Sequence, residues 1–572
     1  MSEESRDETA EAVGPVEPVE PAPPETPAAV AAWRLPPWLE ALAVAAILVM
    51  AAGLRLYALE SAPPGLWFDE GLAGLNALTI LHIDSWRVYS DNREYFGDSP
   101  AFGEEPMFHY LLAFAIRVGG RSALTLRATS AVIGLLTVLA LYGMARVIWG
   151  PGMALLAAFL LASLRWHVHF SRLAFRTILV PLFACLFLLL WWRGVATGRL
   201  RYLVPAGIVL GLGFYTYPAF QLVFAAWVLL WLWRLARERA NRRALLWGFA
   251  WPVLVAVVVA MPLLHYFYEH PDVAGGRVAS LTLFEKGWQP GLRLLAEQAW
   301  DNVRHFWWRG DHVPKHNVPL MPVFDPITGA VFALGLLVTL AGAWRDARNA
   351  LLLLWVACVA VASIFSFGSP NLLRTLAMTP AVVLILANGY VLLARTIGRT
   401  TTRHVAAVAL IGLLGWFGAI EAHRYFVVWA HHPLVPRDFN TAERRLAEAL
   451  LTVERDAPIH MAPELANHPS IRFLLYGRPN VQEIRIPDSF VRSAEGWPRD
   501  RVLAYWHGFW QNRLPGAAPS SDLPVVLFPQ GWFVWRSPDD VLKAYRIPAT
   551  SLMTWPRAVE LVERLEKPRG AP

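Results

Sequence analysis

Apolar runs long enough to cross a bilayer recur along most of this 572-residue chain, and they constrain its fold more than any other feature. A transmembrane helix needs about 20 consecutive, mainly apolar residues. Twelve apolar segments are present, at about 38–59, 104–118, 122–147, 151–165, 173–192, 202–217, 219–233, 245–268, 326–344, 349–367, 373–394 and 404–421. We therefore expect an all-α polytopic membrane protein with about 11–12 transmembrane segments, in which the short, charged segment 104–118 does not cross.

The composition agrees with this class. Hydrophobic residues make up 56% of the chain and charged residues 17%, which excludes the soluble, fibrous and disordered classes. The net charge of +7 does not predict nucleic-acid binding, because the arginines form short clusters between apolar runs, as the positive-inside rule describes. Both cysteines, Cys185 and Cys358, lie inside apolar runs, which argues against a disulfide framework or a thiolate metal site.

Charge also predicts the sidedness of the chain. Residues 1–36 are acidic and proline-rich, which predicts a disordered cytoplasmic tail. Arginine clusters at 191–201, 234–243, 345–348 and 394–403 fall on one side, which is then the cytoplasmic one. The membrane domain, 37–422, consequently has its two long loops, 60–103 and 269–325, on the outer face, and residues 70–83 of the first have the apolar spacing of a helix lying along the interface.

The last part of the chain, 423–572, has a different pattern. It contains no spanning segment, and short apolar stretches alternate with turn residues and a few helical patterns. We expect a small extracytoplasmic α+β domain here. The N-terminus is then cytoplasmic, and the whole protein is a multi-pass protein of a prokaryotic plasma membrane.

Two pairs of acids lie in or beside the first outer loop. Asp69 and Glu70 follow Trp67 and Phe68 at the membrane surface, where burial against aromatic rings raises a carboxyl pKa toward the range of a general base or a metal ligand. The alternative is an ordinary charge at a helix N-terminus. A second pair, 104–105, precedes Pro106 and His109 at the start of the next apolar segment and should return to the same face; the alternative there is a snorkelling interfacial acid.

Cations gather on the same predicted face. Arg172 and Arg176 have i,i+4 spacing and could grip one phosphate from one helical face, with contact to lipid head groups as the alternative. The loop 307–326 carries His312, Lys315, His316 and Asn317, which suit a phosphate or sugar hydroxyls, or form an ordinary solvated loop. Pro314 interrupts the two histidines, so zinc is weakly supported. Arg374 ends a late span and should face protein or a polar cavity.

The order of these motifs resembles a known family. It runs from FDE (68–70) through EPMF (105–108), LTLRATSAVIGLLTVLALYGMARVIWG (124–150) and FSRLAFR (170–176) to HNVP (316–319) and FDPITG (324–329). This combination resembles the GT-C glycosyltransferases, specifically the dolichyl-phosphate-mannose protein mannosyltransferase-like group, which is related to the lipid A aminoarabinose transferases. The resemblance covers about residues 38–400.

The resemblance implies an inverting transfer of a sugar from a polyprenyl-phosphate donor in the bilayer to a lipid, glycan or protein acceptor on the outer face. Asp69 matches the family's catalytic acid, Glu70 its partner, and Glu105 the acid before proline. The aminoarabinose group has Glu-Lys-Pro where this chain has Glu104-Glu105-Pro106, so the lysine for the donor phosphate is missing. The residues left to bind that phosphate are Arg172, Arg176, Lys315 and Arg374.

Other polar residues of the two loops are expected to contact substrate: Glu104, His109, His312, His316 and Asn317. No cofactor or metal site is required by the pattern, and a divalent cation is left open. The rival function is a transporter or lipid flippase, which predicts ionisable residues in the middle of spans. A non-catalytic scaffold is a third reading, and alanine at Asp69 separates it from an enzyme.

Overall fold

We describe the protein from a computed structural model. It describes residues 35–82, 86–90, 92, 103–273, 288–366, 368–451, 459–461, 463–478, 481–483, 524–525, 531–536, 542–547 and 553–554. The predicted tail, 1–36, lies outside the described residues except for its last two, and so does much of the predicted domain at 423–572.

Long apolar helices form the body of the molecule. Within the described residues, nine helices have the length and composition to cross a membrane: α2 (Pro37–Leu56), α6 (Ala123–Ile148), α9 (Leu179–Thr197), α11 (Phe220–Arg237), α12 (Arg242–Glu269), α15 (Pro326–Ala343), α16 (Ala347–Ile364), α17 (Thr379–Thr400) and α18 (Arg403–His423). The protein is therefore a multi-pass membrane protein, as predicted.

Three further apolar helices are shorter: α5 (Met107–Gly119), α7 (Pro151–Ser163) and α10 (Leu200–Gly213). Each of the twelve apolar segments thus forms a helix, but nine rather than 11–12 of the described helices meet the length expected of a span. A helix of 13 or 14 residues is about 20 Å long, whereas the hydrocarbon core is about 30 Å thick.

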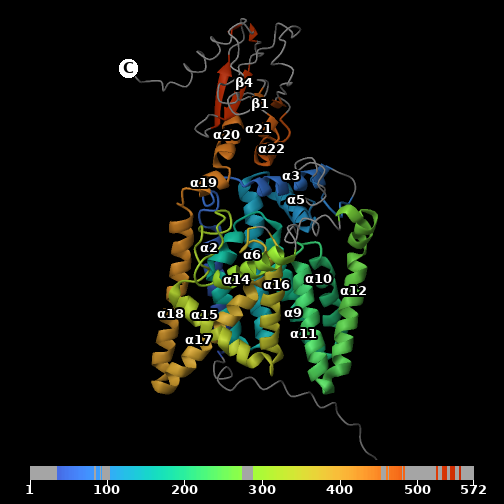
Figure 1. Cartoon of the computed structure of the whole chain (residues 1–572), viewed down its shortest axis with the longest axis vertical. Helices are drawn as coiled ribbons and strands as arrows, with labels where there is room; N and C mark the ends of the chain where they lie inside the picture. The colour runs from blue at the N-terminus through green and yellow to red at the C-terminus, as the bar shows by residue number, and fades with distance from the viewer. Residues whose placement is uncertain are drawn as a thin grey trace, which may run out of the picture.

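The spans stand side by side in one bundle (Figure 1), with α10 against α12, α9 against α6, and α15 against α17. The last pair approaches closely because two glycines face the partner backbone. A Cβ added to Gly335 would lie 2.0 Å from the carbonyl oxygen of Ile385, and one added to Gly389 would lie 2.0 Å from that of Val331. Larger residues at these two positions would force the helices apart.

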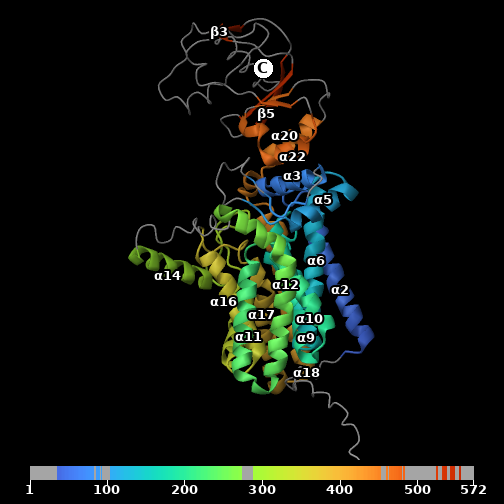
Figure 2. The same ribbon diagram turned by 90° about the vertical axis from the view of Figure 1, so that its right-hand side faces the viewer.

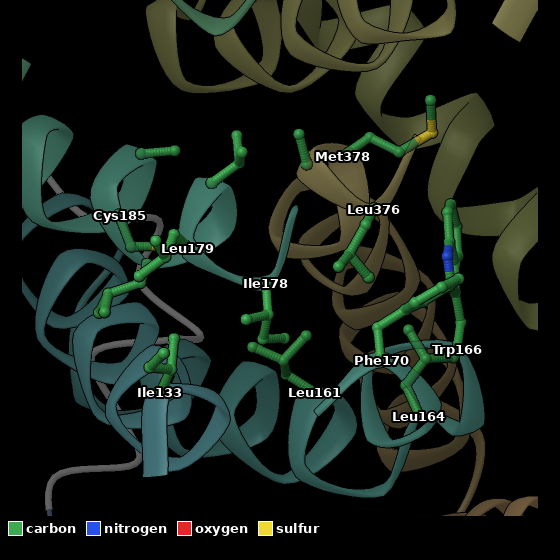
Figure 3. Packing of buried hydrophobic residues seen from close by; sticks show 14 of the residues in the cluster. Ile133, Leu161, Leu164, Trp166, Phe170, Ile178, Leu179, Cys185, Leu376 and Met378 are labelled. Atoms are coloured by element: carbon green, nitrogen blue, oxygen red, sulfur yellow. The ribbon is translucent and has the colours of Figure 1, made fainter. Parts of the chain in front are cut away.

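The core of the bundle joins segments far apart in the sequence. Figure 3 shows Ile178, just before α9, beside Leu161 of α7, with Ile133 of α6 on one side of them and Leu376 on the other. Two short 3₁₀ turns, η2 (Arg176–Ile178) and η5 (Leu376–Met378), and the short helix α8 (Arg165–Phe170) meet there. Both cysteines are free.

One end of the bundle carries the elements that matter for function. Helix α3 (Phe68–His82) lies across this end beside α5, well away from the link η3 (Arg239–Asn241) between α11 and α12 at the opposite end (Figures 1 and 2). The helix predicted at 70–83 is confirmed. The second loop, 269–325, is not simply polar loop: it contains α14 (Trp288–Arg304), which packs on α16.

After α18 the chain continues over the end that carries α3. The elements are η6 (Arg424–Trp429), α19 (Val435–Asp438), α20 (Thr441–Leu451), α21 (Pro463–Ala466) and α22 (Pro469–Leu475). Helix α22 packs directly on α3: Ser470 donates a hydrogen bond to the carbonyl of Leu66 at 2.8 Å, and a Cβ on Gly71 would lie 2.6 Å from the backbone nitrogen of Ser470.

Short strands complete the described part: β1 (Ile459–Met461), β2 (Val481–Glu483), β3 (Pro524–Val525), β4 (Gly531–Arg536), β5 (Leu542–Ile547) and β6 (Met553–Thr554). One sheet has the order β2-β1-β4-β5, with β1 parallel to both neighbours and β4 antiparallel to β5; β3 and β6 pair separately. The complete α+β domain remains a prediction, because the segments between these strands lie outside the described residues.

Candidate active site

Asp69 lies in the first turn of α3, where helices favour acidic side chains. Its neighbour Trp67 is buried and stacks on Phe175 with ring centroids 5.4 Å apart. No described residue forms a hydrogen bond with the Asp69 carboxylate. Burial raises the pKa of Asp69 to about 6, against the opposing attraction of Lys315 and Arg176. The pKa of Asp69 is thus close to neutral pH, as a general base requires.

Glu70 has a different role, although it is adjacent to Asp69. One oxygen accepts hydrogen bonds from Arg127 Nε at 2.9 Å and the backbone nitrogen of Ala174 at 3.0 Å. The other accepts from Arg127 Nη2 at 2.9 Å and the backbone nitrogen of Trp67 at 3.0 Å. Since a carboxylate has about four lone-pair sites, none is left for a substrate. These hydrogen bonds fix the turn that carries Asp69, and the part of Glu70 in the chemistry stays a prediction.

Arg127 is a buried residue beside Asp69 and Glu70 that the sequence analysis did not single out. It lies in α6, is fully buried, and donates to the carbonyls of Leu59, Pro63 and Gly65 as well as to Glu70. It thereby ties the loop before α3 to a transmembrane helix. The one available signal was an arginine inside an apolar run, which usually faces a polar partner within the protein.

The second acidic pair lies with Arg176, His109 and Ser90. The Arg176 guanidinium forms an ion pair with Glu104, and its Nε lies 3.4 Å from a Glu105 oxygen. His109 Nε2 lies 3.1 Å from Glu104, and its Nδ1 lies 2.9 Å from the Ser90 hydroxyl. Arg176 pairs with these two acids and also acts electrostatically on Asp69. This geometry agrees with the prediction that the second acidic pair returns to the side of Asp69.

Arg172 does not share a helical face with Arg176, so the predicted geometry of that pair is wrong. Helix α8 ends at Phe170, and η2 begins only at Arg176. Arg172 is fully buried and donates to the Tyr425 hydroxyl and to the carbonyls of Leu54, Arg55, Ala58 and Ala62 at the end of α2. Its donors satisfy two carbonyls in the last turn of α2 and two in the turn that follows, so Arg172 acts as a helix cap.

Lys315 lies beside the Asp69 turn. Its ammonium is 5.1 Å from the centre of the Trp67 ring, and it forms no ion pair with any described residue. The loop is fixed by His169, whose Nε2 lies 2.7 Å from the Lys315 carbonyl oxygen. Lys315 therefore offers an unneutralised positive charge near Asp69, held over an aromatic face.

The other predicted residues of this loop have distinct surroundings. Asp311 accepts from the backbone nitrogen of Leu372 at 2.9 Å and lies 3.0 Å from His316 Nδ1, which orients that ring toward Trp67. Asn317 donates to two carbonyls of its own loop and accepts from Arg165, so it holds the loop together. His312 is exposed beside Gly368.

Arg374 lies in a segment that packs against the turn carrying Arg176. The hydroxyl of Thr177, next to Arg176, donates to the Leu373 carbonyl at 3.4 Å, and η2 packs on η5. The Arg374 guanidinium is half-buried and forms no ion pair with any residue that the structure describes. Of the four predicted phosphate ligands, Lys315 and Arg374 thus keep unneutralised charges, whereas Arg176 is paired with acids. No cluster of three or more histidine, cysteine, aspartate or glutamate residues in the described ranges could hold a metal ion.

Comparison with solved structures finds loose overall likenesses to membrane glycosyltransferases. The chain is 12% identical to the Archaeoglobus fulgidus oligosaccharyltransferase, with a TM-score of 0.47. The match covers 77% of this chain and 63% of that chain. ArnT of Cupriavidus metallidurans, solved with undecaprenyl phosphate, is 16% identical, with a TM-score of 0.41; the match covers 79% of this chain and 86% of ArnT. The S. cerevisiae protein O-mannosyltransferase complex, solved with its sugar donor, is 20% identical, with a TM-score of 0.33; the match covers 43% of this chain and 36% of that chain.

No curated protein matches the chain. The family model for dolichyl-phosphate-mannose-protein mannosyltransferases matches residues 98–266, a range that includes Glu104, Glu105, Arg127 and Arg176. The resemblance predicted from the sequence motifs, to the dolichyl-phosphate-mannose protein mannosyltransferase-like group, is therefore confirmed over residues 98–266.

Proposed function

We propose that this protein is a membrane glycosyltransferase that moves a sugar from a polyprenyl-phosphate donor to an extracytoplasmic acceptor, with inversion at the anomeric carbon. The observation that carries the proposal is the Asp69 carboxylate. It forms no hydrogen bond with a described residue, its pKa is raised to about 6, and two cations act on it. Glu70, one residue further, is instead fully occupied by structural hydrogen bonds.

Asp69 acts as the general base in this proposal. A hydroxyl acceptor is a poor nucleophile, so a base must take its proton as its oxygen attacks the anomeric carbon. The bond from that carbon to the phosphate oxygen breaks in the same displacement, the proton ends on Asp69, and the configuration inverts. A base whose pKa is about 6 is ionised at neutral pH and still basic enough to accept a proton.

Lys315 and Arg374 bind the donor phosphate. Phosphate leaves with added negative charge, and fixed cations stabilise a developing charge best where water is excluded. In this proposal Lys315 takes the role of the lysine in the Glu-Lys-Pro pattern of the aminoarabinose group. Arg176 is less suited to the phosphate, because Glu104 and Glu105 already balance its charge. It orients those acids toward the sugar hydroxyls.

The remaining predictions on site and placement belong to this proposal. Glu105, with Glu104, His109 and His316, lines the sugar side of the site, and His312 contacts the acceptor. The donor reaches the site laterally from the bilayer, because α3 and α5 lie at the end of the spans (Figure 1). That end is extracytoplasmic in this proposal, the N-terminus is cytoplasmic, the region 423–572 forms an outer domain, and the membrane is the plasma membrane of a prokaryote.

The experiment compares the glycan and lipid profile of a deletion strain with that of the parent, which identifies the acceptor. Purified protein in vesicles then receives a radiolabelled polyprenyl-phosphate sugar and that acceptor. We expect a glycosylated product of inverted configuration from wild type, little from Asp69→Asn, and a normal amount from Asp272→Asn, which makes the same chemical change at an exposed site. Movement of label across the membrane without any new glycosidic bond would instead support the transporter class.

A further inference from the structure

Helix α14 (Trp288–Arg304) has an exposed apolar strip that the proposed reaction does not use. Leu292 is 55% exposed, Trp300 56% and Val303 48%, and Ala296 is exposed as well. The spacing i, i+4, i+8 and i+11 puts these four side chains on one face of the helix. The two buried residues of the helix, Gly291 and Asn302, lie on a neighbouring face, and α14 as a whole packs on α16.

The attachment of α14 is specific. Asn302 donates a hydrogen bond to the hydroxyl of Ser369 at 2.7 Å, which ties the C-terminal half of α14 to the chain just beyond α16. The helix therefore has a fixed rotation about its axis. The exposed apolar strip lies on a different face of the helix from Asn302.

We propose that α14 is an interfacial anchor whose strip of Leu292, Ala296, Trp300 and Val303 is embedded in the acyl chains of the adjacent membrane leaflet. Figure 2 shows α14 running sideways out of the upper part of the bundle, across the direction of α12 and below α3. A helix in this orientation, between two spans, lies along a membrane plane. Amphipathic helices with tryptophan on the apolar side occupy that position.

The charges of α14 identify acyl chains, not anionic head groups, as the partner. Arg293 lies 2.9 Å from Glu297, and Arg304 lies 2.7 Å from Asp301, so the two positive and two negative side chains are paired within the helix. A helix that depended on anionic lipid would present unpaired lysine or arginine. Insertion of α14 should therefore be independent of anionic lipid and of salt.

The anchor has a consequence for the site if the proposed reaction is correct. The chain runs from the end of α14 at Arg304 directly into the loop that carries Lys315. A helix seated in the leaflet would set the depth of that lysine near the plane in which a lipid-linked phosphate lies. The anchor itself is tested without any reference to the reaction.

The test is nitroxide scanning in reconstituted vesicles. Single cysteines replace residues 292–300 one at a time in a background carrying Cys185→Ala and Cys358→Ala, and each is spin-labelled. Collision rates with oxygen, which concentrates in hydrocarbon, and with a water-soluble nickel chelate give the depth of each label. Val258→Cys, 64% exposed on α12, calibrates the hydrocarbon, and Glu448→Cys, exposed on α20, calibrates water.

We expect the labels at Leu292, Ala296 and Trp300 to resemble the label at Val258, and the label at Glu297 to resemble the label at Glu448. The pattern should be the same with and without phosphatidylglycerol. Water-like values at all scanned positions would overturn the proposal. Insertion only in the presence of anionic lipid would overturn the role of the acyl chains. Dipolar broadening between labels at Trp300, persisting at high lipid dilution, would show that a second copy of the chain covers the strip and would also overturn it.

Discussion

Replacing Glu70 by glutamine should destabilise the fold strongly, although its neighbour Asp69 tolerates the equivalent change. The Glu70–Arg127 pair is buried completely on both sides, with 2.9 Å between the charged atoms. Glutamine keeps one accepting oxygen but presents N–H donors where the other oxygen accepts from Arg127 and a backbone nitrogen. Removing one partner of a buried pair leaves the other charge uncompensated, which costs about 3–5 kcal/mol.

Asp69→Asn should act in the opposite direction at neutral pH. The pKa of Asp69 rises from 3.8 to about 6 because burial disfavours its charge. Ionised Asp69 therefore costs the fold at most about 3 kcal/mol, less whatever its partial exposure to water screens. This cost is absent at low pH, where the group is protonated in both states, grows as pH rises toward 6, and is complete above it. The Asp69→Asn variant should thus be as stable as wild type or more stable at pH 7.5, and equal to it near pH 3.

Thermal unfolding in detergent measures both effects. Cys185 is fully buried, so its reaction with a fluorogenic maleimide reports unfolding in a background carrying Cys358→Ala. Glu70→Gln should lower the unfolding temperature, and a second change, Arg127→Met, should recover part of the loss because no buried charge then lacks a partner. The reasoning is refuted if Glu70→Gln unfolds like wild type while Asp69→Asn at pH 7.5 unfolds earlier.

Three further predictions concern the site and the bundle. The initial rate of sugar transfer should rise with pH through about 6 and level off above it, because Asp69 must be ionised to accept a proton; a rate that falls over this range contradicts that role. Lys315→Met or Arg374→Met should each lower kcat/KM for the donor by a factor of about 10–100, the equivalent of one charge-assisted contact, whereas Met at the exposed Arg309 should not. Gly389→Ala should lower the unfolding temperature by separating α15 from α17, at a cost of about 1–3 kcal/mol, and an unchanged temperature would show that the pair relaxes freely.

The sequence predicts the membrane class and the helices well, because a bilayer demands long apolar runs that are visible without any knowledge of packing. It predicts α14 poorly. Charged residues alternate with the apolar ones along the sequence of that helix, and its average hydrophobicity is low, so residues 269–325 look like a polar loop. Only the periodicity of the apolar positions, which holds for a surface helix, distinguishes the two.

At the site, the sequence indicates which residue types gather but not which of them are already satisfied. Asp69 and Glu70 are adjacent and chemically similar, yet Glu70 is held by Arg127 and two backbone nitrogens and Asp69 is not. Arg172 and Arg176 have ideal helical spacing, but the chain between them is not helical, and their partners lie in different parts of the fold. Partners distant in sequence decide these roles, and local spacing does not reveal them.

The central claim is that the Asp69 carboxylate takes the proton of the acceptor while other groups bind the donor. Single-turnover kinetics in vesicles test it most directly, with donor binding and the chemical step measured separately for wild type, Asp69→Asn and Asp272→Asn. Loss of a general base lowers the rate of the chemical step by a factor of about 100–10,000. The account predicts this loss for Asp69→Asn with donor affinity almost unchanged, and wild-type behaviour for Asp272→Asn. A chemical step of normal rate in Asp69→Asn would contradict it.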